Sequence, residues 1–158
     1  MTTTTNFSHR RQQRIFYCSL ILGVLLSVCQ IMPARAIETD IRAPHVVFHI
    51  DQPEQAIIAI REINNQRKVM PNAQITVIAL GAGIAFLLDD AKDPNGNAYA
   101  ALFDTLLLEG VKFSACLNTL DAKGIPPSEL SPGVGTVRSG IAEITRLQWE
   151  EGYAYIKP

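Results

Sequence analysis

The stretch Val111–Gly124, which reads VKFSACLNTLDAKG, joins the pattern of a strand to the pattern of a helix through a single cysteine. Its first five residues alternate between apolar and polar, the period-2 signature of a strand. After the cysteine the alternation stops, and Asn118 or Thr119 could cap a short helix. Cys116 is therefore expected at the carboxyl end of a strand, where open α/β sheets place ligands and reactive groups. A helix amino terminus there would also favour a thiolate over a thiol.

Similar patterns extend to both sides of this stretch. Strands are expected at 45–50, 74–80, 111–115, 135–137 and 153–156. Helical patterns separate them, beginning near 51–54, 84, 99, 117, 126 and 139. Residues 74–80 are so apolar that both faces of that strand should be covered, as in a parallel sheet. Five strands that alternate with helices predict an α/β protein with a mainly parallel, doubly wound sheet.

The last expected helix has clear boundaries. Ser139 fits its amino-terminal cap, and Gly152 fits its end. Ile141, Ile144 and Leu147 recur at helical spacing, so all three are expected to face the core.

The amino terminus has the three parts of an export signal. His9–Arg14 is basic, residues 15–29 are apolar, and a small-x-small cleavage site ends at Ala36. Cleavage there would leave residues 37–158 as a periplasmic or secreted domain. Two alternatives remain open: the signal is retained as an anchor, or Cys29 is lipidated.

Removal of residues 1–36 would also change the charge. The chain has 14 Lys and Arg and 15 Asp and Glu, and four of the basic residues but none of the acidic ones lie in this segment. The remaining domain would carry 10 basic and 15 acidic residues, a formal charge of −5. Nucleic acid and anionic membranes are poor partners for such a surface. No later segment is apolar enough to insert stably in a membrane.

The cysteine count bears on the chemistry. Cys18 and Cys29 lie in the signal, so Cys116 would be alone in the exported domain. A single thiol in an oxidising compartment cannot form an intramolecular disulfide. Cys116 is then either buried and chemically inert, or exposed and chemically reactive.

Several segments together resemble one family. These are the run 113–124, the turn 81–84, the segment 132–135 and the ending 151–158. They resemble the DsrE/DsrF-like family, in particular the single-domain members described as intracellular sulfur oxidation proteins, and the likeness extends over 46–158.

This resemblance implies a flavodoxin-like three-layer α/β/α fold and assembly into homo-trimers or homo-hexamers. It also implies a cysteine that carries sulfur as a persulfide, and Cys116 matches the place of that cysteine. Two features depart from the family pattern: the sulfur-relay branches are cytoplasmic, and this domain has no second cysteine to resolve a persulfide.

Metal binding is not expected. His45 and His49 lie four residues apart on one strand and hence on one face, but two imidazoles alone make a poor metal site, and packing is the better interpretation. Acidic residues in 89–95 resemble part of a calcium loop but lack its spacing and its terminal glutamate.

No cofactor is expected either. Gly81 and Gly83 form a tight turn or, in the alternative, cradle a phosphate or help to bind the substrate. Asp51 and Glu54 lie where flavodoxin-like proteins hold a flavin phosphate, and their charges would repel it.

Two functions remain. In the first, the protein is a sulfane sulfur carrier or a sulfurtransferase in which Cys116 accepts sulfur and Asn118 or Thr119 stabilises the anion. Its partners would be sulfur donor and acceptor proteins or small sulfur compounds. In the second, the protein is a non-catalytic oligomeric scaffold with a structural cysteine. In either case Tyr99, Trp149 or Tyr153 could be sealed between subunits.

Overall fold

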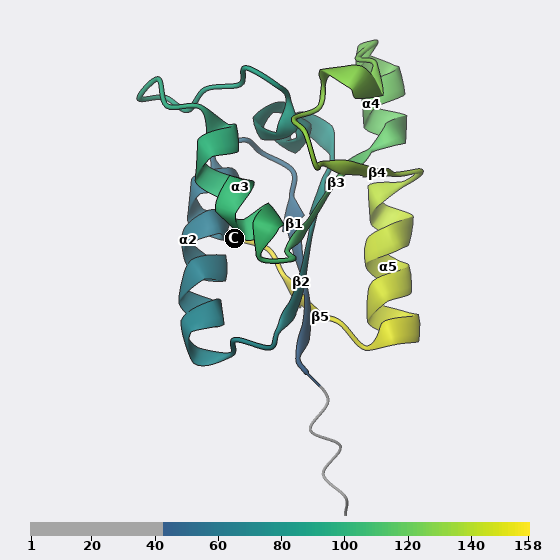
Figure 1. Cartoon of the computed structure of the whole chain (residues 1–158). Coiled ribbons are helices and arrows are strands. Elements are labelled where there is room, and N and C mark those ends of the chain that lie inside the picture. The colour runs from purple at the N-terminus through teal and green to yellow at the C-terminus, as the bar shows by residue number, and fades with distance from the viewer. Residues whose placement is uncertain (1–42) are drawn as a thin grey trace, which may run out of the picture. The chain divides into compact units, whose positions relative to one another are not determined.

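The computed structural model describes residues 43–158, which form a five-stranded parallel sheet with helices on both faces (Figure 1). The strands are β1 (His45–Ile50), β2 (Gln74–Ala79), β3 (Lys112–Cys116), β4 (Gly135–Val137) and β5 (Ala154–Ile156), in the order β4-β3-β2-β1-β5. The helices are α2 (Gln55–Val69), α3 (Tyr99–Leu108), α4 (Leu117–Lys123) and α5 (Gly140–Glu151), with 3-10 turns η2 (Gly81–Leu87) and η3 (Pro127–Glu129). The predicted α/β fold with a parallel sheet is confirmed. The expected signal, residues 1–36, lies outside the described residues.

The sheet separates two cores. On one face α2, η2 and α3 cover a large cluster in which Phe103 lies between Phe86 and Phe113, with ring centroids 6.0 and 5.0 Å apart. Each such buried ring contributes roughly 1.5–3 kcal/mol through the apolar area that it removes from water. On the other face α5 covers a smaller cluster of Val47, Ile78, Ile144, Leu147 and Tyr153. β2 pairs with β1 and β3 and is buried from Ile75 to Ala79, as its continuous apolar run predicts.

α5 is rotated from the orientation expected. Gly140, Ile144 and Leu147 face the sheet, and Ile144 and Leu147 are buried as predicted. The prediction for Ile141 is wrong, because this side chain is 57% exposed. The helix approaches β2 through Gly140, so the inward stripe runs at i, i+4 and i+7 from that glycine, about 100° away from Ile141.

The helix ends follow local rules with one exception. Ser139 caps α5, since its Oγ accepts a hydrogen bond from the amide of Ala142 at 3.4 Å, and Gly152 ends the helix with φ 70°. In α4, however, the cap position is held by Cys116 and not by Asn118 or Thr119.

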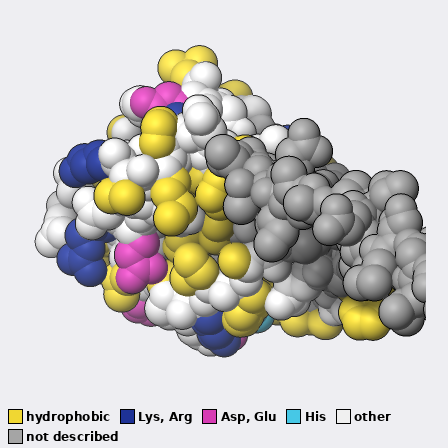
Figure 2. All heavy atoms as spheres, turned by 90° about the horizontal axis from the view of Figure 1, so that it is seen from below, with side chains coloured by type: hydrophobic (Ala, Val, Ile, Leu, Met, Phe, Trp, Pro, Cys, Tyr) yellow, Lys and Arg dark blue, Asp and Glu magenta, His cyan; other side chains and the backbone are white. Residues whose placement is uncertain are grey.

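The aromatic residues expected on the surface divide into two groups. Tyr99 and Tyr153 are buried in the cores of this chain, whereas Trp149 is 88% exposed on α5. Val69, Met70 and Leu108 are also exposed, at the ends of α2 and α3. These helices run antiparallel to the strands, so their ends lie near the amino ends of the strands, the side on which Figure 2 shows apolar side chains among charged ones. Within residues 43–158 no helix is long and apolar enough to cross a membrane.

The loop between η2 and α3 is organised by one carboxylate. Asp93 is buried, and its Oδ1 accepts hydrogen bonds from the amides of Asn95 and Asn97, each at 2.8 Å. The Asn97 side chain donates a further bond at 3.1 Å. These bonds lower the pKa of Asp93, the side chain of Asn97 contributing most. The carboxylate that resembled a calcium ligand thus serves the turn itself.

Candidate functional site

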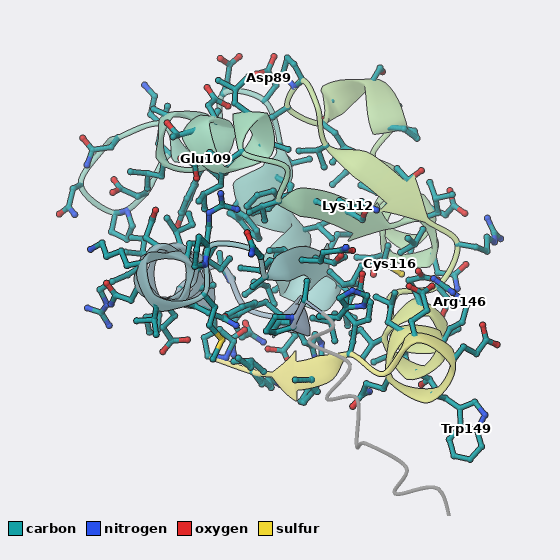
Figure 3. The ribbon with its side chains drawn as sticks, turned by 60° about the horizontal axis from the view of Figure 1, so that its bottom comes forward. Asp89, Glu109, Lys112, Cys116, Arg146 and Trp149 are labelled. Atoms are coloured by element: carbon teal, nitrogen blue, oxygen red, sulfur yellow. The ribbon has the colours of Figure 1, made fainter. Side chains whose placement is uncertain are left out.

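Cys116 lies where three strands end and two helices begin. It is the last residue of β3 and the cap residue of α4, and its backbone is extended with φ −73° and ψ 115°. The end of β2, the end of β4 and the start of α5 meet at the same place, as hydrogen bonds described below show. The cysteine is 5% exposed and lies on the face of the sheet that α5 covers (Figure 3).

The amide of Gly140 donates a hydrogen bond to the sulfur of Cys116, with 3.2 Å between nitrogen and Sγ. Gly140 is the first residue of the 12-residue helix α5, so the sulfur faces the positive end of that helix. A side chain at this position would require Leu80 to shift. A Cβ on Gly140 would lie 2.8 Å from Cδ2 of Leu80 and 3.2 Å from Cγ2 of Ile78. Glycine thus permits the close approach that brings the amide to the sulfur.

Thr119 and Asn118 attach the start of α4 to its neighbours. The Oγ1 of Thr119 accepts a hydrogen bond from the amide of Gly81 at 3.1 Å, which ties α4 to the turn after β2. The amide of Asn118 donates to the carbonyl of Arg138 at 3.2 Å, which ties α4 to the end of β4. Both residues predicted for the site therefore lie beside Cys116.

The environment acts on the acidity of the thiol in two opposing ways. Burial raises the pKa of Cys116, because it disfavours the charged thiolate. The hydrogen bond from the Gly140 amide contributes most to lowering the pKa, the nearby hydroxyl and amide of Thr119 and the amide of Asn118 contribute less, and together they outweigh burial. The net effect is a pKa below the ordinary value for a cysteine, so more of the nucleophilic thiolate is present at neutral pH.

The two glycines predicted near the site have different surroundings. Gly81 adopts a left-handed conformation with φ 60°, and its amide is used by Thr119. Gly83 passes so close to β1 that a Cβ would lie 2.4 Å from the carbonyl oxygen of Ile50, and its amide donates to the Asp51 carbonyl at 2.9 Å. Both amides are therefore engaged within the chain, as a tight turn requires, and only Gly81 is linked to the cysteine.

The turn after β1 is closed in a similar way. The side-chain oxygen of Gln55 accepts hydrogen bonds from the amides of Asp51 and Gln52 at 3.0 and 3.2 Å. The Asp51 carboxylate forms an ion pair with Lys157. The backbone amides that could hold a phosphate at this end of β1 are thus occupied by a side chain of α2.

The histidines of β1 have separate partners. His45 packs against Tyr153, with ring centroids 4.9 Å apart, and Nδ1 of His49 lies 2.8 Å from the hydroxyl of Tyr155. Burial, reinforced by the charge of Lys157, lowers the pKa of His49. Across residues 43–158 no three His, Cys, Asp or Glu side chains come together as metal ligands would.

Gly140 is the functional residue that the sequence patterns did not single out. Its neighbours Leu80 and Val137, which pack on the α5 side of the sheet, were not expected at the site either. A glycine directly after the cap residue Ser139 was the available signal, because such a position is compatible with many residues and a glycine there suggests a close approach.

The chain is similar to proteins of one family. The family model described as "DsrE/DsrF-like family" matches residues 45–158. A solved structure of a protein of unknown function, MTH1491 from Methanobacterium thermoautotrophicum, is similar with a TM-score of 0.66 and 35% identity, over 73% of this chain and 99% of that one. The ychN protein from E. coli is similar in fold, with a TM-score of 0.59 and 18% identity over 73% and 98% of the two chains. No curated protein matches the chain.

The matched range includes the segments that carried the resemblance, namely the cysteine stretch, the glycine turn and the carboxyl-terminal ending. Members of this family are associated with sulfur relay. The chain belongs to the DsrE/DsrF-like family.

Proposed function

We propose that the protein carries sulfane sulfur as a persulfide on Cys116. The observation that carries the proposal is the hydrogen bond of 3.2 Å from the Gly140 amide to the sulfur, together with the other donors of α4. These donors lower the pKa of Cys116 despite its burial, and a lowered pKa is what a thiolate nucleophile needs at neutral pH. Membership of a family associated with sulfur relay supports the same role.

The transfer needs no cofactor. The Cys116 thiolate attacks the outer sulfur of a donor R–S–SH, the S–S bond of the donor breaks, and R–S⁻ leaves with the electron pair. The product is Cys116–S–SH, which loses its proton to become the persulfide anion. An acceptor thiolate then attacks the outer sulfur and regenerates the Cys116 thiolate. The amide of Gly140 and the hydroxyl of Thr119 are placed to stabilise negative charge on sulfur before and after transfer.

A structural role for the cysteine is the competing proposal. The low exposure of Cys116, 5%, favours it, because a small apolar side chain is commonly buried at such a place. A merely space-filling residue, however, does not require a hydrogen bond to its sulfur from the first amide of a helix, with further donors nearby. The sulfur-carrier role accounts for both the donors and the glycine that admits one of them.

Export and assembly are part of the proposal. We infer that the signal is cleaved after Ala36, so that the domain acts in the periplasm or outside the cell. The lipidated and anchored forms are the alternatives. We also infer a homo-trimer or homo-hexamer that exchanges sulfur with donor and acceptor proteins or with small sulfur compounds.

Mass spectrometry of the folded protein tests the sulfur-carrier role. Incubation with sodium tetrasulfide should add about 32 Da per sulfur, located on Cys116 by peptide mapping. The Cys116→Ser variant should gain nothing while keeping its fold. Ser114→Ala, which alters the neighbouring side chain on the same face of β3, is the matched control and should load normally. If the folded wild-type protein gains no sulfur and also resists alkylation by iodoacetamide, Cys116 is structural.

A further inference from the structure

The sulfur of Cys116 has an aliphatic side chain on each side. β2 and β3 pair with Ala79 opposite Ala115, so the next residues, Leu80 and Cys116, lie side by side and point to the same face. On the other side β4 pairs with Val137 opposite Cys116. Leu80 and Val137 are only partly buried and pack on the α5 core, so they flank the sulfur toward the surface.

Leu80 and Cys116 both lie against Gly140. The Cδ2 of Leu80 lies 2.8 Å from the place of a Cβ on Gly140, and the amide of that same glycine is 3.2 Å from the sulfur. Leu80 and the sulfur therefore contact the first residue of α5 from neighbouring strands. A reagent that reaches the sulfur across this edge of the sheet would pass along Leu80 or Val137.

The charged residues nearest to Cys116 in sequence do not place a cation beside its sulfur. Arg138, directly after Val137, forms a salt bridge of 3.2 Å with Asp121, and both side chains are largely exposed. Lys112 lies four residues earlier on β3, roughly 13 Å along the strand. Among residues 43–158 the hydrogen-bond donors around the sulfur are backbone amides and one hydroxyl, and no cation is among them.

We propose that Leu80 and Val137 select the sulfur donor, admitting uncharged or weakly hydrated persulfides and polysulfides and excluding sulfur oxyanions such as thiosulfate. The sulfonate of thiosulfate is strongly hydrated, and next to two aliphatic side chains it would lose water without gaining a cation. A persulfide presents a polarisable sulfur to the same walls, and the negative charge that it delivers goes to the amide of Gly140. This selectivity rests on the proposed role of Cys116 as a sulfur carrier.

The two donors give the same product and differ in what leaves. With methyl hydropersulfide, Cys116–S⁻ and CH3–S–SH give Cys116–S–SH and CH3–S⁻. With thiosulfate, Cys116–S⁻ and S–SO3²⁻ give Cys116–S–S⁻ and SO3²⁻. In each case one S–S bond breaks and one forms, so no oxidant or reductant is needed. The rates of the two reactions can therefore be compared on one protein by the gain of one sulfur.

The experiment measures the rate of sulfur gain at Cys116 with each donor in three proteins. Wild-type protein should load from methyl hydropersulfide at least about tenfold faster than from thiosulfate, relative to the same two reactions of a small thiol of matched pKa. Val137→Lys places a cation beside the sulfur and should reduce this preference by about tenfold or more. Thr136→Lys is the matched control: it adds the same charge one residue earlier, opposite Ala115 and thus on the other face of β4, and should retain the wild-type preference.

The outcomes separate the two proposals. Equal loading from both donors in wild-type protein overturns the selectivity while the carrier role stands. The same preference in Val137→Lys and Thr136→Lys also overturns it, because the side chain at position 137 would then have no effect on the choice of sulfur donor. Absence of loading from every donor, including tetrasulfide, removes the carrier role itself.

Discussion

The hydroxyl of Thr119 can both accept and donate a hydrogen bond at the candidate site. Its oxygen accepts the Gly81 amide, so its own proton is directed away from that amide and toward the sulfur, where it helps to lower the pKa of Cys116. Thr119→Val keeps the shape but removes this donor. The midpoint of the alkylation rate against pH should therefore move to higher pH, measured with iodoacetamide on the folded protein.

Thr105→Val is the control for that experiment, because Thr105 is exposed on α3, away from the cysteine. Its alkylation profile should match that of the wild-type protein. An unchanged midpoint in Thr119→Val would show that the backbone amides alone set the acidity of the thiol.

Gly83 provides a second prediction at the scale of the residue. A methyl group there would lie 2.4 Å from the backbone oxygen of Ile50, and backbone cannot move aside as a side chain can. Gly83→Ala should cost roughly 1–3 kcal/mol of unfolding free energy or more, measured by urea denaturation. Gly135→Ala is the contrast, since its Cβ would have no neighbour closer than 3.6 Å. That variant should stay within about 0.5 kcal/mol of wild type, and equal losses in both would contradict the argument.

At the scale of the elements, the pairing of β1 with β5 should make stability depend on pH in two steps. The pKa of His49 is lowered, first by burial, so below its ordinary value of 6.5 the unfolded chain takes up a proton that the folded chain resists, and stability falls. The pKa of Asp51 is lowered, first by its hydrogen bond with Lys157, so its contribution is complete above 3.8 and is lost as the pH falls further. Urea denaturation at a series of pH values should resolve both steps.

Variants assign the steps. His49→Gln should remove the step near neutral pH, and Asp51→Asn should remove the acidic one. His45→Gln is the matched control, since it replaces the other histidine of β1 and leaves the bond between His49 and Tyr155 in place. Loss of the first step in His45→Gln, or its persistence in His49→Gln, would assign the effect to another group.

Local signals predicted the elements well, because they act over a few residues. The alternation before Cys116 and the cap at Ser139 each depend on the neighbouring residues alone, and both are confirmed. The orientation of α5 was not predictable in this way, because Ile141, Ile144 and Leu147 fit an inward stripe as well as the stripe that begins at Gly140. The choice between them is made by the contact of Gly140 with β2, which is tertiary.

The same limit applies to the site. Cys116 was found from its place at a strand end, and Thr119 from its closeness in sequence. Gly140, by contrast, is separated from the cysteine by 24 residues. It reaches the sulfur only because β4 lies beside β3 and the chain then turns back over the sheet. The order of the strands cannot be predicted from any short segment of the sequence.

At the scale of the whole molecule, the exposed apolar residues of α5 concern assembly. Trp149 is the only tryptophan of the chain and is 88% exposed within it, pointing away from the sheet (Figure 3). We expect a homo-oligomer by light scattering, with Trp149 covered by a neighbouring copy and its emission shifted to shorter wavelength until dilution separates the copies. Trp149→Ser should weaken association, whereas Leu108→Ser, which removes an equally exposed residue from α3, should not. A monomer at all concentrations, or equal weakening by both variants, would contradict this assignment.

The burial of Cys116 also bears on whether two copies of the protein can form a disulfide with each other. A disulfide between two chains requires their Cβ atoms to come within about 3.8 Å of each other. Each sulfur is hydrogen-bonded to Gly140, flanked by Leu80 and Val137 and 5% exposed, so we expect that two folded copies do not bring their cysteines together. A single thiol can therefore persist in an oxidising compartment without crosslinking the protein. On the proposed carrier role, a persulfide on Cys116 would then be protected from a second copy, and we expect it to pass only to a thiol that can reach the buried sulfur.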